Sequence, residues 1–203
     1  MKTHRTLLVG VGGQGVLTAA QWLGAAAHAQ KLPVVVGQLH GMSQRGGSIE
    51  CSVNVGPGES TVIGPGQADV VLAFEPLEAL RALPRMRHDT RVLVSVGTII
   101  PFELTRTGGV YPEVEAMLRD IRDVATEVVT IDGGKLVGRT GVDRTLNAVM
   151  LGAASALGWL PAAEERILQE VVSRTAVNFR EANRHAFDLG HNAVRASVRE
   201  ATA

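Results

Sequence analysis

The sequence predicts an α/β fold, a Rossmann-like and mostly parallel sheet flanked by helices, with a β-hairpin elaboration and a helical C-terminal third. Three observations support this prediction. A short apolar strand leads into a glycine loop and an alanine-rich helix, Val-rich runs then alternate with helical patterns, and the last third repeats apolar residues at helical spacing. Alternating strands and helices are typical of parallel sheets.

The chain begins with a strand, a turn and a helix. Residues 6–9 predict a short apolar strand, residues 10–15 read GVGGQG, and residues 16–30 predict an alanine-rich helix. We expect a second buried strand over residues 33–36, and after it a polar, glycine-punctuated loop over residues 37–48.

A half-buried strand and its hairpin follow. Residues 49–55 alternate strictly, so that Ile49 and every second residue after it share one face while polar side chains share the other. The turn at 56–60 connects this strand to residues 61–63, which we expect to be its hairpin partner.

The middle of the chain predicts three buried strands, because its apolar runs are short and rich in valine. These runs lie at 70–74, 92–96 and 128–131, and helical patterns at 77–83 and 113–123 separate them.

The last third is expected to be helical. Leu146 to Leu157 and Leu168 to Ala182 each repeat apolar residues at helical spacing, and residues 191–203 are expected to fray. The stripe from Leu168 to Phe179 is expected to be core or subunit interface. All 203 residues are predicted to form a single domain over 1–203, with the helices from about residue 143 packing on the rest.

Composition excludes several classes of protein. Twenty basic and twenty acidic residues cancel, so the surface as a whole does not attract nucleic acid or anionic membranes. No apolar run approaches the roughly 20 residues of a membrane span. Residues 1–10 lack the features of a signal peptide, so we expect a cytoplasmic protein.

Charge is unevenly distributed along the chain. Residues 1–49 contain no Asp or Glu, whereas Lys2, Arg5, Lys31 and Arg45 are basic. The amino-terminal quarter would therefore suit an anionic ligand.

Cysteine and histidine usage argues against metal sites. Cys51 is the only cysteine, which excludes internal disulfides and a self-contained iron–sulfur cluster, since such clusters are held by several thiolates. The closest histidines, His185 and His191, would point to different faces of a helix, so no metal site is predicted. Cys51 belongs to the apolar face of its strand and is expected to be inert packing.

The spacing of the glycine loop fits G-x-G-x-x-G between a strand and a helix. Because glycine has no side chain, the backbone can turn tightly there and present its N–H groups to a phosphate. Its predicted cofactor-binding residues are Gly10, Gly12, Gly13, Gln14 and Gly15. The acidic residue that would hold an adenosine ribose is missing, because the second strand runs into Gly37 and Gln38. The alternative is that these glycines serve only close helix–sheet packing.

The second loop, HGMSQRGGS at 40–48, carries one Arg before two glycines, near hydrogen-bond donors and without an acid to neutralise the guanidinium. In a parallel sheet it lies beside the glycine loop, at the carboxyl ends of the strands where ligands collect. Its predicted binding residues are Ser43, Gln44, Arg45, Gly46 and Gly47. Arg45 is the candidate contact for substrate or another anion, and no catalytic residue is predicted. The alternative is a solvated turn with an exposed Arg45.

Three other residues are weaker candidates. Glu75 and Glu78 flank Pro76 at the start of a helix, where carboxylates accept hydrogen bonds from free N–H groups, so we expect capping or partner contact rather than catalysis. His40 could act as an acid or base beside Arg45, but we interpret it as an ordinary hydrogen-bonding residue.

The combination of GVGGQG at 10–15, GMSQRGG at 41–47 and EPLEALR at 75–81 resembles the gamma-type subunit of 2-oxoacid:ferredoxin oxidoreductases. The glycine loop alone is common, but its pairing with the other two segments is specific. Further similar residues are Asn147, Leu151, Gly152 and NRHAFDLG at 183–190. The resemblance spans almost the whole chain, and within the family the short free-standing form is most similar to the beta subunit of indolepyruvate:ferredoxin oxidoreductases.

The resemblance implies a hetero-oligomer with a larger partner that carries thiamine diphosphate, magnesium and [4Fe–4S] clusters. The complex would decarboxylate a 2-oxoacid, favouring arylpyruvates such as indolepyruvate, pass electrons to ferredoxin and form an acyl-coenzyme A. This chain alone would bind none of those cofactors and would be inactive. It would close the active-site cleft and hold anionic groups of substrate or coenzyme A through Arg45 and the loop backbones.

Two other functions stay open from the residues themselves. A free-standing dinucleotide-dependent reductase would share the glycine loop, although the missing ribose acid argues against it. A non-catalytic structural adaptor would need no ligand, and the acid-free segment 1–49 argues against that reading.

Overall fold

The computed structural model describes residues 2–40, 47–58 and 60–201. The strands are β1 (His4–Val11), β2 (Val34–His40), β3 (Ser48–Val55), β4 (Val70–Ala73), β5 (Arg91–Ser95) and β6 (Glu127–Ile131). The helices are α1 (Val16–Ala29), α2 (Pro76–Arg81), α3 (Phe102–Thr107), α4 (Val114–Val124), α5 (Gly133–Gly138), α6 (Leu146–Ala156), α7 (Glu164–Ser173) and α8 (Arg180–Ala201). None of the helices in these ranges is long and apolar enough to cross a membrane.

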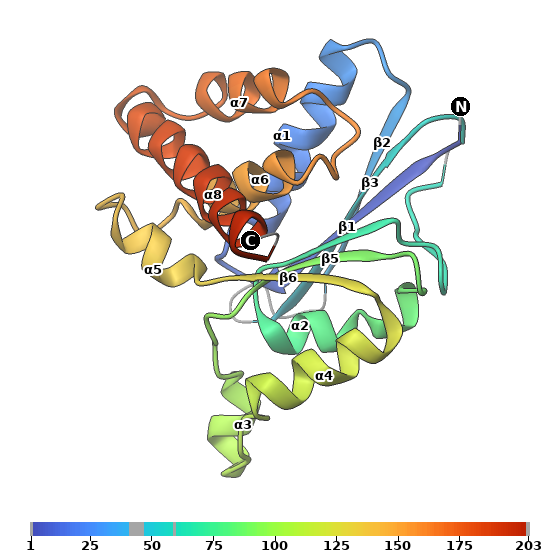
Figure 1. Ribbon diagram of the computed structural model, residues 1–203, viewed down its shortest axis with the longest axis vertical. Helices are drawn as coiled ribbons and strands as arrows, with labels where there is room; N and C mark the ends of the chain where they lie inside the picture. The colour runs from blue at the N-terminus through green and yellow to red at the C-terminus, as the bar shows by residue number, and fades with distance from the viewer. Residues whose placement is uncertain (1, 41–46, 59, 202–203) are drawn as a thin grey trace.

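The six strands form one sheet in the order β2-β3-β1-β4-β5-β6 (Figure 1). β1, β4, β5 and β6 are parallel neighbours, whereas β3 runs antiparallel to both β1 and β2. The predicted mostly parallel α/β sheet with a hairpin and a helical C-terminal third is therefore confirmed.

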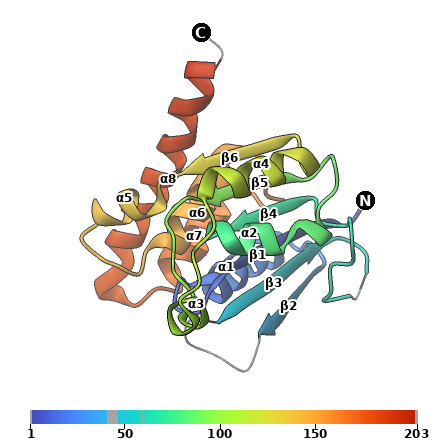
Figure 2. The same ribbon diagram turned by 90° about the horizontal axis from the view of Figure 1, so that it is seen from below.

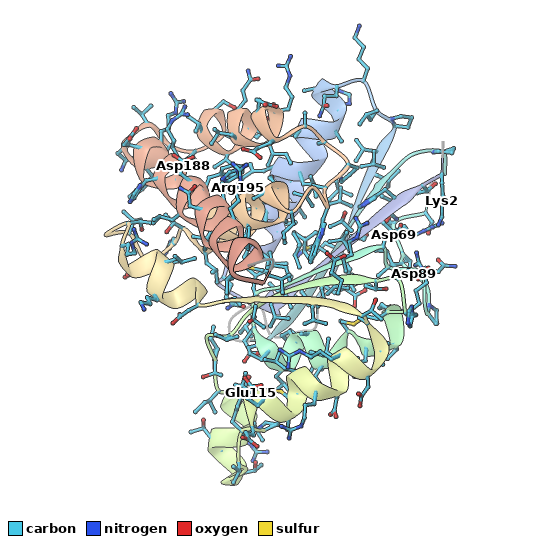
Figure 3. The ribbon with its side chains drawn as sticks, in the orientation of Figure 1. Lys2, Asp69, Asp89, Glu115, Asp188 and Arg195 are labelled. Atoms are coloured by element: carbon cyan, nitrogen blue, oxygen red, sulfur yellow. The ribbon has the colours of Figure 1, made fainter. Side chains whose placement is uncertain are left out.

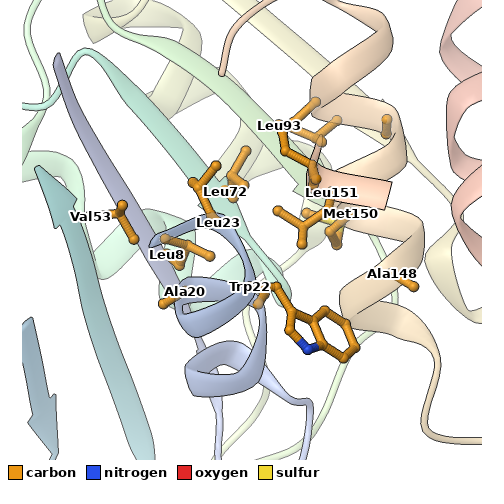
Figure 4. Close-up of a cluster of buried hydrophobic side chains, with 14 of the residues drawn as sticks. Leu8, Ala20, Trp22, Leu23, Val53, Leu72, Leu93, Ala148, Met150 and Leu151 are labelled. Atoms are coloured by element: carbon orange, nitrogen blue, oxygen red, sulfur yellow. The ribbon is translucent and has the colours of Figure 1, made fainter. Parts of the chain in front are cut away.

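Helices cover both faces of the sheet. α1, α6, α7 and α8 lie on one face, and α2 and α4 lie on the other (Figure 1). Leu8, Leu72 and Leu93 of the sheet pack in one cluster with Leu23 of α1 and Leu151 of α6 (Figure 4). The alternate strand residues pack with α2 and α4, which explains why the parallel strands are continuous apolar runs.

The hairpin is formed by β2 and β3, so the prediction that residues 61–63 pair with the preceding strand is wrong. These residues lie over the polar face of β3 instead. The Ser52 hydroxyl donates a hydrogen bond to the Thr61 carbonyl, and the Asn54 amide donates to the Ser60 carbonyl at 2.7 Å. Both side chains are consequently buried, so the second half of β3 is covered on both faces rather than half-buried.

β2 is longer and more exposed than predicted. It continues through Gly37 to His40, and Val36 and Leu39 are 36% and 50% exposed, because β2 is an edge strand. Gly37 belongs to the strand rather than to a loop. A Cβ atom there would lie 2.5 Å from the Thr61 carbonyl oxygen, so only glycine lets the chain cross so closely.

The C-terminal helices differ from the predicted pattern in one respect. The apolar stripe from Leu168 to Phe179 is interrupted, because α7 ends at Ser173 and α8 begins at Arg180, which leaves Phe179 44% exposed. α8 is one long helix that extends away from the rest of the molecule (Figure 2). The helices over 102–107 and 133–138 are absent from the predictions, because these short segments carry little apolar periodicity.

α6 and α8 cross at two glycines. A Cβ on Gly152 would lie 2.0 Å from the Phe187 carbonyl oxygen, and a Cβ on Gly190 would lie 2.0 Å from the Val149 carbonyl oxygen. The backbones of the two helices are therefore in direct contact.

We predict that Gly190→Ala lowers the free energy of unfolding by roughly 1–3 kcal/mol, because the added methyl forces the two helices apart. Urea denaturation followed by circular dichroism measures the change. Gly138→Ala is the matched control, since no atom lies within 4 Å of a Cβ at that position. Equal stability of the two variants would show that the crossing tolerates a wider spacing.

Asp69 joins the beginnings of β1 and β4 (Figure 3). Its carboxylate accepts a hydrogen bond from the Arg87 guanidinium at 2.5 Å and another from the Arg5 backbone N–H at 2.8 Å. Burial alone would raise the pKa of Asp69, but these hydrogen bonds and the charge of Arg87 outweigh it and lower the pKa.

We predict that Asp69→Asn destabilises the protein by about 1.5–3 kcal/mol at neutral pH. Because the folded state has the lower pKa, the contribution of Asp69 is fully present above its unfolded pKa of about 3.9 and is lost as the pH falls through the folded value. Unfolding free energies measured from pH 7 to pH 3 should therefore converge for wild type and variant. Asp89→Asn, at an exposed position, serves as the control. A difference that does not change with pH would contradict the prediction.

Candidate functional site

The glycine loop connects β1 to α1 at the carboxyl edge of the sheet. Two of its glycines are required by packing: a Cβ on Gly10 would lie 2.7 Å from Val16 Cγ2, and a Cβ on Gly15 would lie 2.8 Å from Asn147 Nδ2. Gly15 also has a φ of 80° as it enters α1. Gly13 has a φ of 110° and faces open space, so its backbone is available to a ligand.

The Gln14 side chain hydrogen-bonds to the backbone at both ends. Its side-chain oxygen accepts a hydrogen bond from the Val11 N–H at 2.7 Å, and its amide nitrogen donates to the Phe74 carbonyl at 2.8 Å. Both polar ends of this predicted binding residue are therefore used to attach the loop to the end of β4.

The end of the second predicted loop, Gly47 and Ser48, lies beside the glycine loop. The Gly12 N–H donates to the Gly47 carbonyl at 2.9 Å, which places the start of β3 beside the glycine loop. The next residue, Ser48, donates from its hydroxyl to Glu78 at 2.5 Å. Ser43, Gln44, Arg45 and Gly46 lie outside the described residues.

Glu75 and Glu78 anchor the surroundings of these loops. Glu75 is 1% exposed and caps α2 by accepting hydrogen bonds from the backbone N–H groups of Leu77 and Glu78, which confirms the predicted capping. Its other oxygen accepts from the Tyr111 hydroxyl, and burial together with this carboxylate raises the pKa of Tyr111. Glu78 is 2% exposed and pairs with Arg81 at 2.6 Å. Both carboxylates thus hold structure together.

A pocket of about 880 Å³ lies beside the glycine loop, between the beginnings of α1, α6 and α8. It is lined by Gly13, Gln14, Gly15, Val16, Leu17, Thr18, Trp22, Ile49, Val142, Asp143, Arg144, Asn147, Arg174, Thr175, Phe179 and Asn183.

The pocket is suited to an anion. The first turn of α1 contains no acidic residue, and no side chain caps its N–H groups in the described part of the chain. These N–H groups and the positive end of the helix dipole favour negative charge. The lining also contains Arg144, the carboxylate of Asp143, and Arg174, whose guanidinium is already paired with Glu170.

Two buried amides complete the pocket. Asn147 and Asn183 are each 5% exposed, and the Asn183 side-chain oxygen has no hydrogen-bond partner among the described atoms. Sequence patterns do not predict either as a site residue. In the sequence, each is an asparagine among the apolar residues of a helix. Only the tertiary structure shows that Asn147 lies against Gly15 and that both asparagines line the pocket.

Cys51 takes no part in this site. It is fully buried, and burial raises the pKa of its thiol to about 11, which confirms the prediction of inert packing. Within the described ranges, no group of three or more His, Cys, Asp and Glu side chains is arranged to hold a metal ion.

Comparison with known sequences gives matches over most of the chain. The pattern of the family described as pyruvate ferredoxin/flavodoxin oxidoreductase matches residues 5–193. The indolepyruvate oxidoreductase subunit IorB of Methanothermobacter thermautotrophicus is 35% identical over 190 residues, which make up 94% of this chain and 97% of that protein.

Comparison with solved structures gives the same fold. The gamma subunit of the keto/oxoacid ferredoxin oxidoreductase of Geobacter sulfurreducens superposes with a TM-score of 0.68 at 23% identity, covering 95% of this chain and 99% of that chain. The 2-oxoglutarate:ferredoxin oxidoreductase of Magnetococcus marinus, solved with 2-oxoglutarate, coenzyme A and succinyl-CoA bound, superposes with a TM-score of 0.70 at 18% identity. That match covers 97% of this chain and 32% of the longer one.

We predict that Gln14→Ala destabilises the protein by about 1–3 kcal/mol, because it leaves the N–H of Val11 and the carbonyl of Phe74 without partners in a buried setting. Guanidinium denaturation measures the change. Gln21→Ala, on the exposed side of α1, is the control and should change stability by less than about 0.5 kcal/mol. If both variants unfold at the same denaturant concentration, Gln14 does not hold the loop.

Proposed function

Because the chain belongs to the pyruvate ferredoxin/flavodoxin oxidoreductase family, we propose that it is the small subunit of a 2-oxoacid:ferredoxin oxidoreductase acting on arylpyruvates such as indolepyruvate. The observation that carries this proposal is the full-length match to a subunit of indolepyruvate oxidoreductase at 35% identity. In the proposed reaction a 2-oxoacid and coenzyme A yield an acyl-coenzyme A and carbon dioxide, and two electrons pass to ferredoxin.

We assign thiamine diphosphate, its magnesium ion and the [4Fe–4S] clusters to a larger partner subunit. The residues described in this chain do not fit the clusters or the magnesium ion. Its single cysteine is buried and protonated at neutral pH, whereas a cluster needs several thiolates. No trio of metal-binding side chains is present in the described residues to hold the magnesium ion.

The part proposed for this chain is to bind negative charge beside the partner's active site. The free N–H groups at the start of α1 and the cation Arg144 would hold a phosphate or carboxylate group through charge-assisted hydrogen bonds, beside Arg174, which is paired with Glu170. Coenzyme A and the 2-oxoacid both carry such groups. Arg45 would add a further contact from the neighbouring loop.

The geometry disfavours a free-standing dinucleotide-dependent reductase. In that class the second strand lies beside the first and ends in an acidic residue that holds the ribose. Here β3 separates β2 from β1, and β2 carries Gly37 and Gln38 where the acid is needed.

Reconstitution tests the proposal. We expect the purified chain to be colourless and inactive with 2-oxoacids, and to form a complex with a cysteine-rich, thiamine-dependent protein isolated from the same organism by affinity purification. The complex should reduce a viologen dye with indolepyruvate and coenzyme A. Turnover by the chain alone, or micromolar NADH binding by titration calorimetry, would instead support a reductase.

Arg45→Ala in the same complex tests the anion contact. We expect kcat/KM for the 2-oxoacid or for coenzyme A to fall about ten- to a hundredfold, since a hydrogen bond from a charged group is worth roughly 1.5–3 kcal/mol. Arg45→Lys should recover part of the activity, because an ammonium cannot form the bidentate fork. Complex formation, followed by size-exclusion chromatography, is the control and should be unchanged. If the variant has wild-type kinetics for both substrates, Arg45 does not contact either of them.

A further inference from the structure

Asn147 is a polar side chain in an apolar setting. It is the second residue of α6, lies among buried residues such as Met150 and Leu151, and is 5% exposed. Its side-chain oxygen accepts a hydrogen bond from the Ala148 N–H at 3.0 Å, in the first turn of α6. Because the oxygen accepts this N–H, the other end of the amide is the nitrogen, which carries two hydrogen-bond donors.

The side-chain nitrogen of Asn147 lies against the start of α1. It is 2.8 Å from the position that a Cβ on Gly15 would occupy, and Gly15 is the residue that precedes the first turn of α1. The absent side chain of Gly15 therefore leaves the space that the amide fills. Among the described residues this nitrogen donates no hydrogen bond, yet it is not sealed from the pocket that Asn147 lines.

The other two asparagines buried in the described part of the chain use their nitrogens within the fold. The Asn54 amide donates to the Ser60 carbonyl at 2.7 Å, and the Asn183 amide donates to the Phe179 carbonyl at 3.0 Å. In Asn147 the oxygen is used and the donating end is left for another acceptor. Because a buried polar group without a partner costs free energy, this donor indicates an acceptor supplied by a ligand.

The first turn of α1 adds donors to the same space. The N–H groups of Val16 and Leu17 have no intrahelical acceptor, and no side chain caps them in the described ranges. Arg144 and Asp143 also line the pocket, and their opposite charges offset each other. The preference of the site for an anion is therefore set by the N–H groups of α1 and by the amide beside them, which together suit the several oxygens of an oxyanion.

We propose that Asn147 binds the ligand of this site. Its side-chain amide donates a hydrogen bond to one oxygen of an oxyanion, and other oxygens of the same group accept from the N–H groups at the start of α1. The assignment rests on the proposed function, in which the oxyanion is a phosphate of coenzyme A or the carboxylate of the 2-oxoacid. Both groups present the same chemistry to the amide.

Asn147→Asp separates binding from folding. One carboxylate oxygen keeps the hydrogen bond from the Ala148 N–H, while the other replaces the free donor by a negatively charged acceptor of nearly the same size. Negative charge is favourable at the start of both α1 and α6. We therefore expect the variant to fold, and we expect its carboxylate to occupy the N–H groups of α1 and repel an oxyanion.

Isothermal titration calorimetry on the 203-residue chain tests the assignment, with coenzyme A and indolepyruvate in separate titrations at constant ionic strength. We expect the wild type to bind at least one of them, and the one that binds identifies the source of the oxyanion. Asn147→Asp should bind it about tenfold more weakly or worse. Ser155→Ala is the matched control, because Ser155 also lies on α6 with an unpartnered side-chain oxygen but does not line the pocket. It should bind like the wild type.

Binding of neither compound by the wild type, or equal binding by the wild type and Asn147→Asp, overturns the assignment. Thermal unfolding followed by circular dichroism shows whether each variant is folded. If Asn147→Asp does not fold, Asn147→Ala takes its place, since it removes the amide without adding a charge. The proposed function is tested separately by reconstitution with the larger subunit. An active wild-type complex together with unchanged binding by the variant would exclude Asn147 and leave the proposed function standing.

Discussion

The insertion of β3 between β1 and β2, antiparallel to both, is the constraint on which the rest of the molecule depends. Because β3 runs antiparallel to β1, it begins at the carboxyl edge of the sheet. There the Gly12 N–H donates a hydrogen bond to the Gly47 carbonyl, beside the glycine loop. The same insertion moves β2 to the edge of the sheet and away from the position where a dinucleotide-binding fold holds its ribose.

The carboxyl edge is held together by buried polar groups. Glu75 and Glu78 are buried, and each accepts a side-chain hydrogen bond from another segment, Glu75 from Tyr111 and Glu78 from Ser48. The half-buried Gln14 accepts from Val11 within its own loop and donates to the Phe74 carbonyl. These contacts fix the glycine loop, the start of β3 and α2 relative to one another. Because the loop is already ordered, its free N–H groups lose less conformational entropy when a ligand binds.

The candidate site therefore divides into two kinds of residue. Gly10, Gln14 and Gly15 are used by the fold itself, whereas the N–H groups at the start of α1 and the side chains from α6 to α8 line the space beside them. The proposed anion contacts therefore come from the N–H groups at the start of α1, from Arg144 and from Asn147, not from the residues that hold the loop together.

The sequence by itself determined the strand–loop–helix unit, the parallel strands, the capping role of Glu75 and the burial of Cys51, because each depends on local spacing and periodicity. It also carried the family resemblance. Only the tertiary structure decided that residues 61–63 cover Ser52 and Asn54 instead of pairing, that β2 is exposed, and that Asn147 and Asn183 meet at one pocket. These outcomes depend on contacts between segments far apart in the chain, and no local pattern of apolar residues encodes which segments meet.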